Sequence, residues 1–168
     1  MARRALLLLV PLALTAGVAG AQTRKGVRVT ATVVAGCAVA IDAAGLWGRI
    51  DLGNVAGTDT GVVEAGLASP GGAGVTLDCT PGTVASLSAD AGEHAAGGTR
   101  RLAHPAGAAL PYELLVDGEG APWRDQPVAL AFPTGVQRRV VPIRARAALP
   151  GALPPGRYTD TVRVTLSW

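Results

Sequence analysis

The chain has 168 residues, of which 15 are Lys or Arg and 12 are Asp or Glu. Two of the basic residues, Arg3 and Arg4, lie in a segment that we expect to be removed, which leaves 13 basic and 12 acidic side chains. This balance gives no strong field for nucleic acid or acidic lipid. The length suits one domain with a real core.

The N-terminal segment, residues 1–21, has the layout of a secretory signal peptide. Arg3 and Arg4 precede a run of fourteen apolar residues, 5–18, and Ala19-Gly20-Ala21 follows as a small-residue cleavage site. A membrane-spanning helix needs about 20 apolar residues, and Pro11 interrupts this run. We therefore expect export and a mature chain that begins at Gln22.

A long alternating pattern follows, in "GVRVTATVVAGCAVAI" at residues 26–41. Small or apolar side chains occupy every odd position from Val27 to Ile41, which is the period of a half-buried β-strand. The parity is unbroken, so the pattern does not say where one strand ends and another begins.

Further strands are predicted between Gly- and Pro-rich spacers, and no amphipathic helix is evident. The segments are "GRIDLGNV" (48–55), "AGVTLDC" (73–79), "TVASLSAD" (83–90), "LPYELLVD" (110–117), "PVALAF" (127–132), "RRVVPIRAR" (138–146) and the last strand, 162–168. Short strands at this spacing favour an antiparallel sandwich or barrel.

The last strand has its apolar residues at Val162, Val164, Leu166 and Trp168. Because no further strand follows these residues, the sheet edge beside them needs a partner from elsewhere.

The two cysteines, Cys37 and Cys79, both lie in strand patterns. An even pair in an exported chain predicts a disulfide. On the chain-entropy model, closing a loop of this length stabilises the fold by about 4 kcal/mol.

No catalytic or metal-binding pattern is present, so we expect no enzyme and no cofactor. His94 and His104 sit in Gly-, Ala- and Pro-rich loops without a ligand at metal-binding spacing. Asp78 and Asp160 are interpreted as strand or turn carboxylates. The pairs Arg100-Arg101 and Arg138-Arg139 are interpreted as parts of solvated strand faces.

Four segments together resemble the spore coat protein U domain family. They are "VTATVVAGCAV", "VTLDCTPGT", "GGTRRL…LPYELLVD" and "PIRARAALPGALPPGRYTDTVRVTLSW". That family includes the pilin subunits of archaic, Csu-type chaperone–usher pili. Two departures affect loops: Leu52 stands where an aromatic residue is usual, and "PWRD" replaces a Trp-Gly.

The resemblance implies an all-β, immunoglobulin-like antiparallel sandwich that lacks its final strand. Residues 22–35 would be an N-terminal donor-strand extension and residues 36–168 the sandwich domain. The strand at Val162, Val164, Leu166 and Trp168 would border an open groove, which a neighbouring subunit fills by strand addition. The donor side chains would be those of Val27, Val29, Ala31 and Val33.

The implied partners are neighbouring subunits in a head-to-tail polymer, a periplasmic chaperone and an outer-membrane usher. The chain would cross the periplasm to an extracellular fimbrium or the cell surface, where it would serve adhesion or biofilm formation. Three alternatives stay open: a spore or cell coat protein, an adhesive or carbohydrate-binding module, and a segment 26–34 that is an ordinary edge strand of its own domain.

Overall fold

The computed structural model describes residues 22–116 and 122–168, so the predicted signal peptide lies outside the described residues. The chain divides into two units, Met1–Val33 and Val34–Trp168. In the first unit, residues 22–33 are exposed and form no strand or helix. No helix long and apolar enough to cross a membrane occurs in the described part of the chain.

The second unit contains twelve strands and, over its described residues, no helix. Their bounds are β1 Cys37–Val39, β2 Arg49–Ile50, β3 Thr60–Ser69, β4 Gly72–Ala73, β5 Val75–Cys79, β6 Val84–Ala89, β7 Arg100–Ala103, β8 Ala109–Val116, β9 Val128–Ala131, β10 Arg138–Val141, β11 Ile143–Pro150 and β12 Val164–Ser167.

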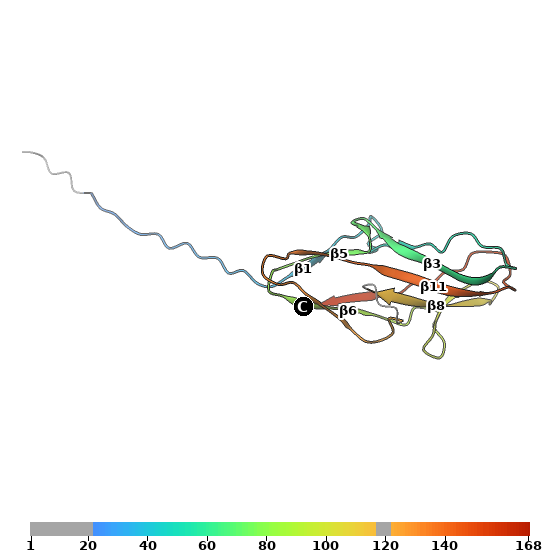
Figure 1. Cartoon of the computed structure of the whole chain (residues 1–168). Coiled ribbons are helices and arrows are strands. Elements are labelled where there is room, and N and C mark those ends of the chain that lie inside the picture. The colour runs from blue at the N-terminus through green and yellow to red at the C-terminus, as the bar shows by residue number, and fades with distance from the viewer. Residues whose placement is uncertain (1–21, 117–121) are drawn as a thin grey trace, which may run out of the picture. The chain divides into compact units, whose positions relative to one another are not determined.

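The strands form three antiparallel sheets. One has the order β1-β5-β10, one the order β2-β3-β11-β8-β7 with β4 also on β3, and one the order β12-β6-β9. The sheets pack face to face as a sandwich (Figure 1). This confirms the predicted all-β, immunoglobulin-like class.

Proline divides one long strand between two of these sheets. Val141 ends β10, which pairs with β5, and Ile143 begins β11, which pairs with β3 and β8. Pro142 lies between them and has no N–H to donate to a ladder. Beside this crossing, Gly74 adopts a positive φ of 91°. A side chain at Gly74 would press against the carbonyl oxygen of Val141, so glycine is required there.

The core comes from strands whose side chains alternate as the sequence predicts. Ile143, Ala145, Ala147 and Leu149 of β11 are buried, while the residues between them are half-buried or exposed. Leu77, Leu87, Leu130 and Val141 are fully buried and Phe132 is 1% exposed. Aliphatic side chains from all three sheets therefore fill the interior, with few aromatic rings.

Candidate strand-addition site

The strand β12 has one paired edge and one open edge. It pairs with β6 from Val164↔Ala89 to Ser167↔Ser86. The N–H of Asp90 donates to the carbonyl of Arg163 at 2.9 Å, so Arg163 directs its main-chain groups toward β6. Successive residues of a strand direct theirs to opposite sides. The main-chain groups of Val162, Val164 and Leu166 therefore point to the edge that no described strand occupies.

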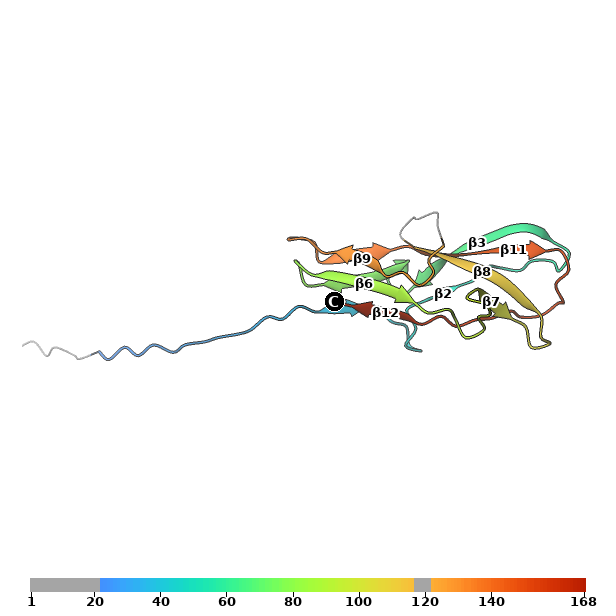
Figure 2. The ribbon, with the colours of Figure 1, turned by 90° about the horizontal axis from the view of Figure 1, so that it is seen from below.

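The strand β1 has a similar open edge. It pairs only with β5, in the register Cys37↔Cys79 and Val39↔Leu77. The N–H of Thr80 donates to the carbonyl of Gly36 at 2.9 Å. By the same alternation, the main-chain groups of Cys37 and Val39 point away from β5. Both views place the C-terminal end of β12 near β1 (Figures 1 and 2).

The side chains along these two edges are only partly covered. Cys37, Val39, Val162, Val164 and Leu166 pack against the core but stay half-buried. These residues thus combine incompletely buried apolar side chains with main-chain groups at an open edge. An added strand could cover the apolar side chains and form hydrogen bonds with the main-chain groups.

Trp168 continues the apolar parity of the last strand in the sequence, but its side chain is 59% exposed. The pairing of β12 with β6 ends at Ser167, and Trp168 lies beyond it. The strand itself is also shorter than the pattern of residues 162–168, beginning at Val164. The indole ring of Trp168 is therefore exposed to solvent in the isolated chain.

The predicted disulfide is confirmed: Cys37 and Cys79 are bonded, with an S–S distance of 2.06 Å. The two residues are directly opposite in the β1–β5 ladder and their Cα atoms are 4.1 Å apart. That separation fits a pair that exchanges no main-chain hydrogen bonds. The bond therefore attaches β1, a strand of three residues, to the core.

Replacing both cysteines with Ser tests this attachment. The closed loop spans 42 residues, so we expect the unfolding free energy to fall by about 4 kcal/mol. Binding of an added strand should weaken as well, because β1 loses its covalent attachment. Denaturant unfolding and peptide binding measure the two effects. A double variant that binds an added strand as tightly as the parent would show that β1 does not need the disulfide.

The predicted donor segment is fully accessible in the structure. Val27 is 87%, Val29 89% and Val33 86% exposed, and Ala31 is exposed too. The continuous strand pattern of residues 26–41 forms an actual strand only at Cys37–Val39. Residues 22–36 belong to no sheet of the structure.

Sequence reasoning missed the two-residue strand β4, which it read as part of a spacer, and also missed the longer strands β3 and β7. The longest strand, β3, contains Gly61 and Gly66, and glycine was read as turn punctuation. Its side chains alternate nevertheless, with Val63, Ala65 and Leu67 half-buried. The strand β7 begins at Arg100. Its charged side chain is buried, whereas a charged residue is expected on the exposed face of a strand.

The interpretation of Arg100 as part of a solvated face is wrong. The side chain is only 7% exposed, and burial lowers the pKa of the guanidinium. Its Nη1 donates to the carbonyl of Trp123 at 2.5 Å, and its Nη2 and Nε donate to the carbonyl of Asp90 at 2.6 and 2.9 Å. The carbonyls of Ala89 and Arg124 are further acceptors. Arg100 therefore joins β6, β7 and the segment around Trp123.

Asp160 is also more enclosed than a turn carboxylate. Its side chain is 1% exposed. Tyr112 donates its hydroxyl to Oδ2 at 2.7 Å, and His94 donates its main-chain N–H to Oδ1 at 3.1 Å. Burial, and next the hydrogen bond to Asp160, raise the pKa of Tyr112. This carboxylate holds the chain before β12 against β8.

Arg138 lies on a solvated strand face, as the sequence predicts. Arg138 and Asp78 form a two-bond pair at 2.8 and 2.9 Å across β10 and β5. The pKa of the Asp78 carboxyl is lowered by this hydrogen bonding. Among the described residues, no group of three His, Cys, Asp or Glu side chains could hold a metal ion.

Comparison with known proteins gives the chain its family. The family model of the Spore Coat Protein U domain matches residues 23–165. The chain belongs to this family, which supports the expectation of a structural, non-enzymatic protein. Curated proteins gave no match.

A solved structure shares the fold. It is a chain of the CsuC-CsuE chaperone–tip adhesion subunit pre-assembly complex, from the archaic chaperone–usher Csu pili of Acinetobacter baumannii. The TM-score is 0.56 at 16% sequence identity, and the match covers 82% of this chain. It spans only 40% of the other chain.

Proposed function

We propose that the chain is an exported structural subunit of a surface fimbrium, assembled by the chaperone–usher pathway. Residues 1–21 are the signal peptide, residues 22–35 the donor strand and residues 36–168 the acceptor sandwich. One observation carries the proposal: the same chain has open sheet edges and an alternating segment that pairs with no strand. The open edges are at β1 and β12, and the exposed alternating segment precedes them in the sequence.

In this mechanism, one donor strand lies between β1 and β12 of the neighbouring subunit. Its main chain bonds to the outward-directed groups of Val39, Val164 and Leu166. Val27, Val29 and Val33 of the donor are between 86% and 89% exposed before assembly. Burying each contributes about 1.5 kcal/mol or more, in addition to the main-chain hydrogen bonds. Because donor and acceptor are different surfaces, each added subunit presents a new acceptor and a filament grows.

The family and the solved structure support two of the proposed partners, a chaperone and neighbouring pilus subunits. The similar chain was crystallised in a pre-assembly complex of a chaperone with a pilus subunit. A chaperone that occupies the open edges would prevent premature assembly, since an unpaired apolar edge is prone to aggregate. An outer-membrane usher would then exchange the chaperone for a donor strand. The assembled fimbrium would serve adhesion or biofilm formation.

The state of the purified chain tests the proposal. Expressed without a chaperone, the full chain should aggregate or polymerise, and an excess of a peptide of residues 22–35 should keep it monomeric. A scrambled peptide of the same composition is the matched control, and light scattering measures the size. A monodisperse monomer without any peptide would contradict the proposal.

A coat protein is the second candidate, because the matching family is named for the spore coat. This function could use the same strand addition without a fimbrial shaft. A chaperone and an usher encoded beside the gene would favour the fimbrium. Their absence, with the protein found in the coat of dormant cells, would favour the coat.

A further inference from the structure

The register of the strand addition, meaning which donor residue lies opposite which residue of the last strand, is not fixed by the apolar pattern alone. Small or apolar side chains occupy every odd position from Val27 to Ala35. The acceptor repeats this spacing at every even position from Val162 to Trp168. A slip by two residues keeps every side chain on the same face of a strand. Other side chains must therefore select one register.

The direction of the donor strand follows from the two open edges. β1 begins, and β12 ends, beside the turn that joins β5 to β6, because Gly36 accepts a hydrogen bond from Thr80 and Ser167 pairs with Ser86. The two strands thus run in opposite directions, and a strand between them is antiparallel to only one of them. Antiparallel pairing is the more stable kind, and β12 offers a longer open edge than β1, which has three residues. The donor strand therefore runs antiparallel to β12.

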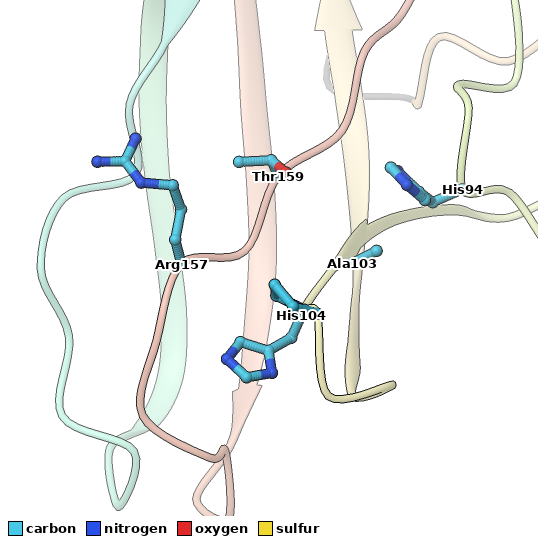
Figure 3. A pocket seen from close by; sticks show the side chains of 6 residues that line it. His94, Ala103, His104, Arg157 and Thr159 are labelled. Atoms are coloured by element: carbon cyan, nitrogen blue, oxygen red, sulfur yellow. The ribbon is translucent and has the colours of Figure 1, made fainter.

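The segment that leads into β12 is held in place before the acceptor edge begins. Ala103 donates its N–H to the carbonyl of Thr159 at 2.8 Å, and Thr159 donates back at 3.0 Å. Figure 3 shows these two residues on their neighbouring segments. The Asp160 side chain is 1% exposed and accepts the hydroxyl of Tyr112 at 2.7 Å. The acceptor edge thus has a fixed start at Val162.

The other end of the acceptor edge carries an exposed aromatic ring. Trp168 has the parity of Val164 and Leu166, which pack against the core, but its own side chain is 59% exposed. Its indole lies at the end of β12 that is close to β1 (Figures 1 and 2). An aromatic face in this place can bind a cation as well as an apolar side chain.

The donor segment carries one cation at the parity of its apolar side chains. Among residues 22–35, Lys25 is the only charged residue at an odd position, and Arg24 and Arg28 occupy even positions. No Asp or Glu occurs in this segment. Burying the Lys25 ammonium in an apolar groove without a partner is costly. Lys25 therefore limits how far the donor strand can slide past β12.

We propose that Trp168 and Lys25 set the register of strand addition between two copies of this chain. This inference rests on the proposed function, and the occupant is the segment 25–33 of the second copy. Val27 lies opposite Trp168, and the Lys25 ammonium lies over the indole ring as a cation–π contact. Diagonal neighbours on paired strands are about 7–8 Å apart, within reach of a long side chain. The remaining donor residues Val29, Ala31 and Val33 then lie opposite Leu166, Val164 and Val162.

Slips by two residues lose part of this match. In one direction, Val33 moves opposite Asp160, whose carboxylate is already bound by Tyr112, and so leaves the apolar edge. In the other direction, Val27 passes beyond Trp168, and the smaller Ala35 takes a place in the groove. The Lys25 ammonium then no longer reaches the ring. Only the proposed register places all four donor side chains on the acceptor edge with Lys25 at the indole.

Disulfide cross-linking in fibres of the full chain measures the register. One chain carries Ser167→Cys and is mixed with a chain that carries Arg28→Cys, Thr30→Cys or Thr32→Cys. Ser167 directs its main-chain groups toward β6, so on the open side it exchanges no main-chain hydrogen bonds with the donor. Cys37 and Cys79 form their disulfide in such a pair, with Cα atoms 4.1 Å apart. The covalent dimers are quantified on denaturing gels, and mass spectrometry identifies the linked peptides.

We expect Arg28→Cys to give at least tenfold more covalent dimer with Ser167→Cys than either threonine variant. A dominant product from Thr30→Cys would mean a slip by two residues and would overturn the proposed register. A dominant product from Thr32→Cys would mean a parallel donor strand and would overturn the proposed direction. Fibres that give none of the three products would contradict strand addition at β12 itself, so that failure is distinct from a wrong register.

Substitutions at the two residues test their role. Trp168→Ala and Lys25→Gln should each reduce the tenfold preference at least fivefold, whereas Trp168→Tyr and Lys25→Arg should keep it. Arg24→Gln is the matched control, because it removes a neighbouring charge of the opposite parity, and it should leave the preference unchanged. An unchanged preference in Trp168→Ala or Lys25→Gln would overturn the proposal. An equal loss in Arg24→Gln would show that the net charge of the segment, and not the contact with Trp168, acts on the register.

Discussion

Val29→Asp should abolish fibre formation while the melting temperature of the acceptor domain stays unchanged. In the proposed assembly, Val29 inserts into the neighbouring subunit, and an aspartate there would be a buried charge without a partner. Such a charge costs several kcal/mol. The domain's own stability should not change, because the Val29 side chain is 89% exposed in the isolated chain.

The neighbouring residue supplies the control. Thr30→Asp introduces the same charge on the opposite face of the donor strand, so fibres should still form. Electron microscopy of fibres and the melt of the subunit, held by its chaperone or by an added donor peptide, give the two measurements. A subunit melt that falls with Val29→Asp would mean that residues 26–34 are an edge strand of their own domain. Fibres that persist with Asp at both Val29 and Val33 would mean that another segment is the donor.

The alternation of side chains was enough to predict most of the fold. In β11, buried and less buried residues alternate along the whole strand as the sequence pattern requires, whereas the alternation is broken in β5 by the buried Thr76 and in β8 by the buried Leu115. The pairing of Cys37 with Cys79 followed from export and an even number of cysteines. The strand β3 could not be located from its local pattern, because two glycines interrupt that pattern. Its ladder with β11 shows where the strand lies. The ion pair of Glu64 with Arg144, at 2.6 Å, belongs to that ladder.

The polar sites could not be predicted because distant segments build them. His94 and Asp160 are 66 residues apart in the sequence, and nothing in their local surroundings indicates contact. Local patterns identify elements, whereas such sites depend on which elements become neighbours. The open edge of β12 was anticipated because the resemblance concerned the whole domain, whereas the open edge of β1 was not predicted.

Arg100 and Arg101 form a natural matched pair for a test of the buried polar network. They are adjacent on β7, yet Arg100 is buried and Arg101 is only half-buried, with one hydrogen bond from Nε to the carbonyl of His94 at 3.0 Å. Any effect of losing a positive charge is common to both substitutions. A difference between them therefore reports the contacts of Arg100.

Arg100→Met should lower the free energy of unfolding by about 3–5 kcal/mol, because buried carbonyls lose a charged donor. The carbonyls of Asp90 and Trp123 accept its shortest hydrogen bonds, and methionine offers nothing in exchange. Arg101→Met should cost less than about 1 kcal/mol, since water can reach its acceptor. Arg100→Lys should fall between them, because a single ammonium cannot span carbonyls on separate segments. Urea unfolding of the donor-completed subunit, followed by tryptophan fluorescence, measures all three. Equal losses for Arg100→Met and Arg101→Met would show that charge alone, and not the bridge between β6, β7 and Trp123, sets the stability.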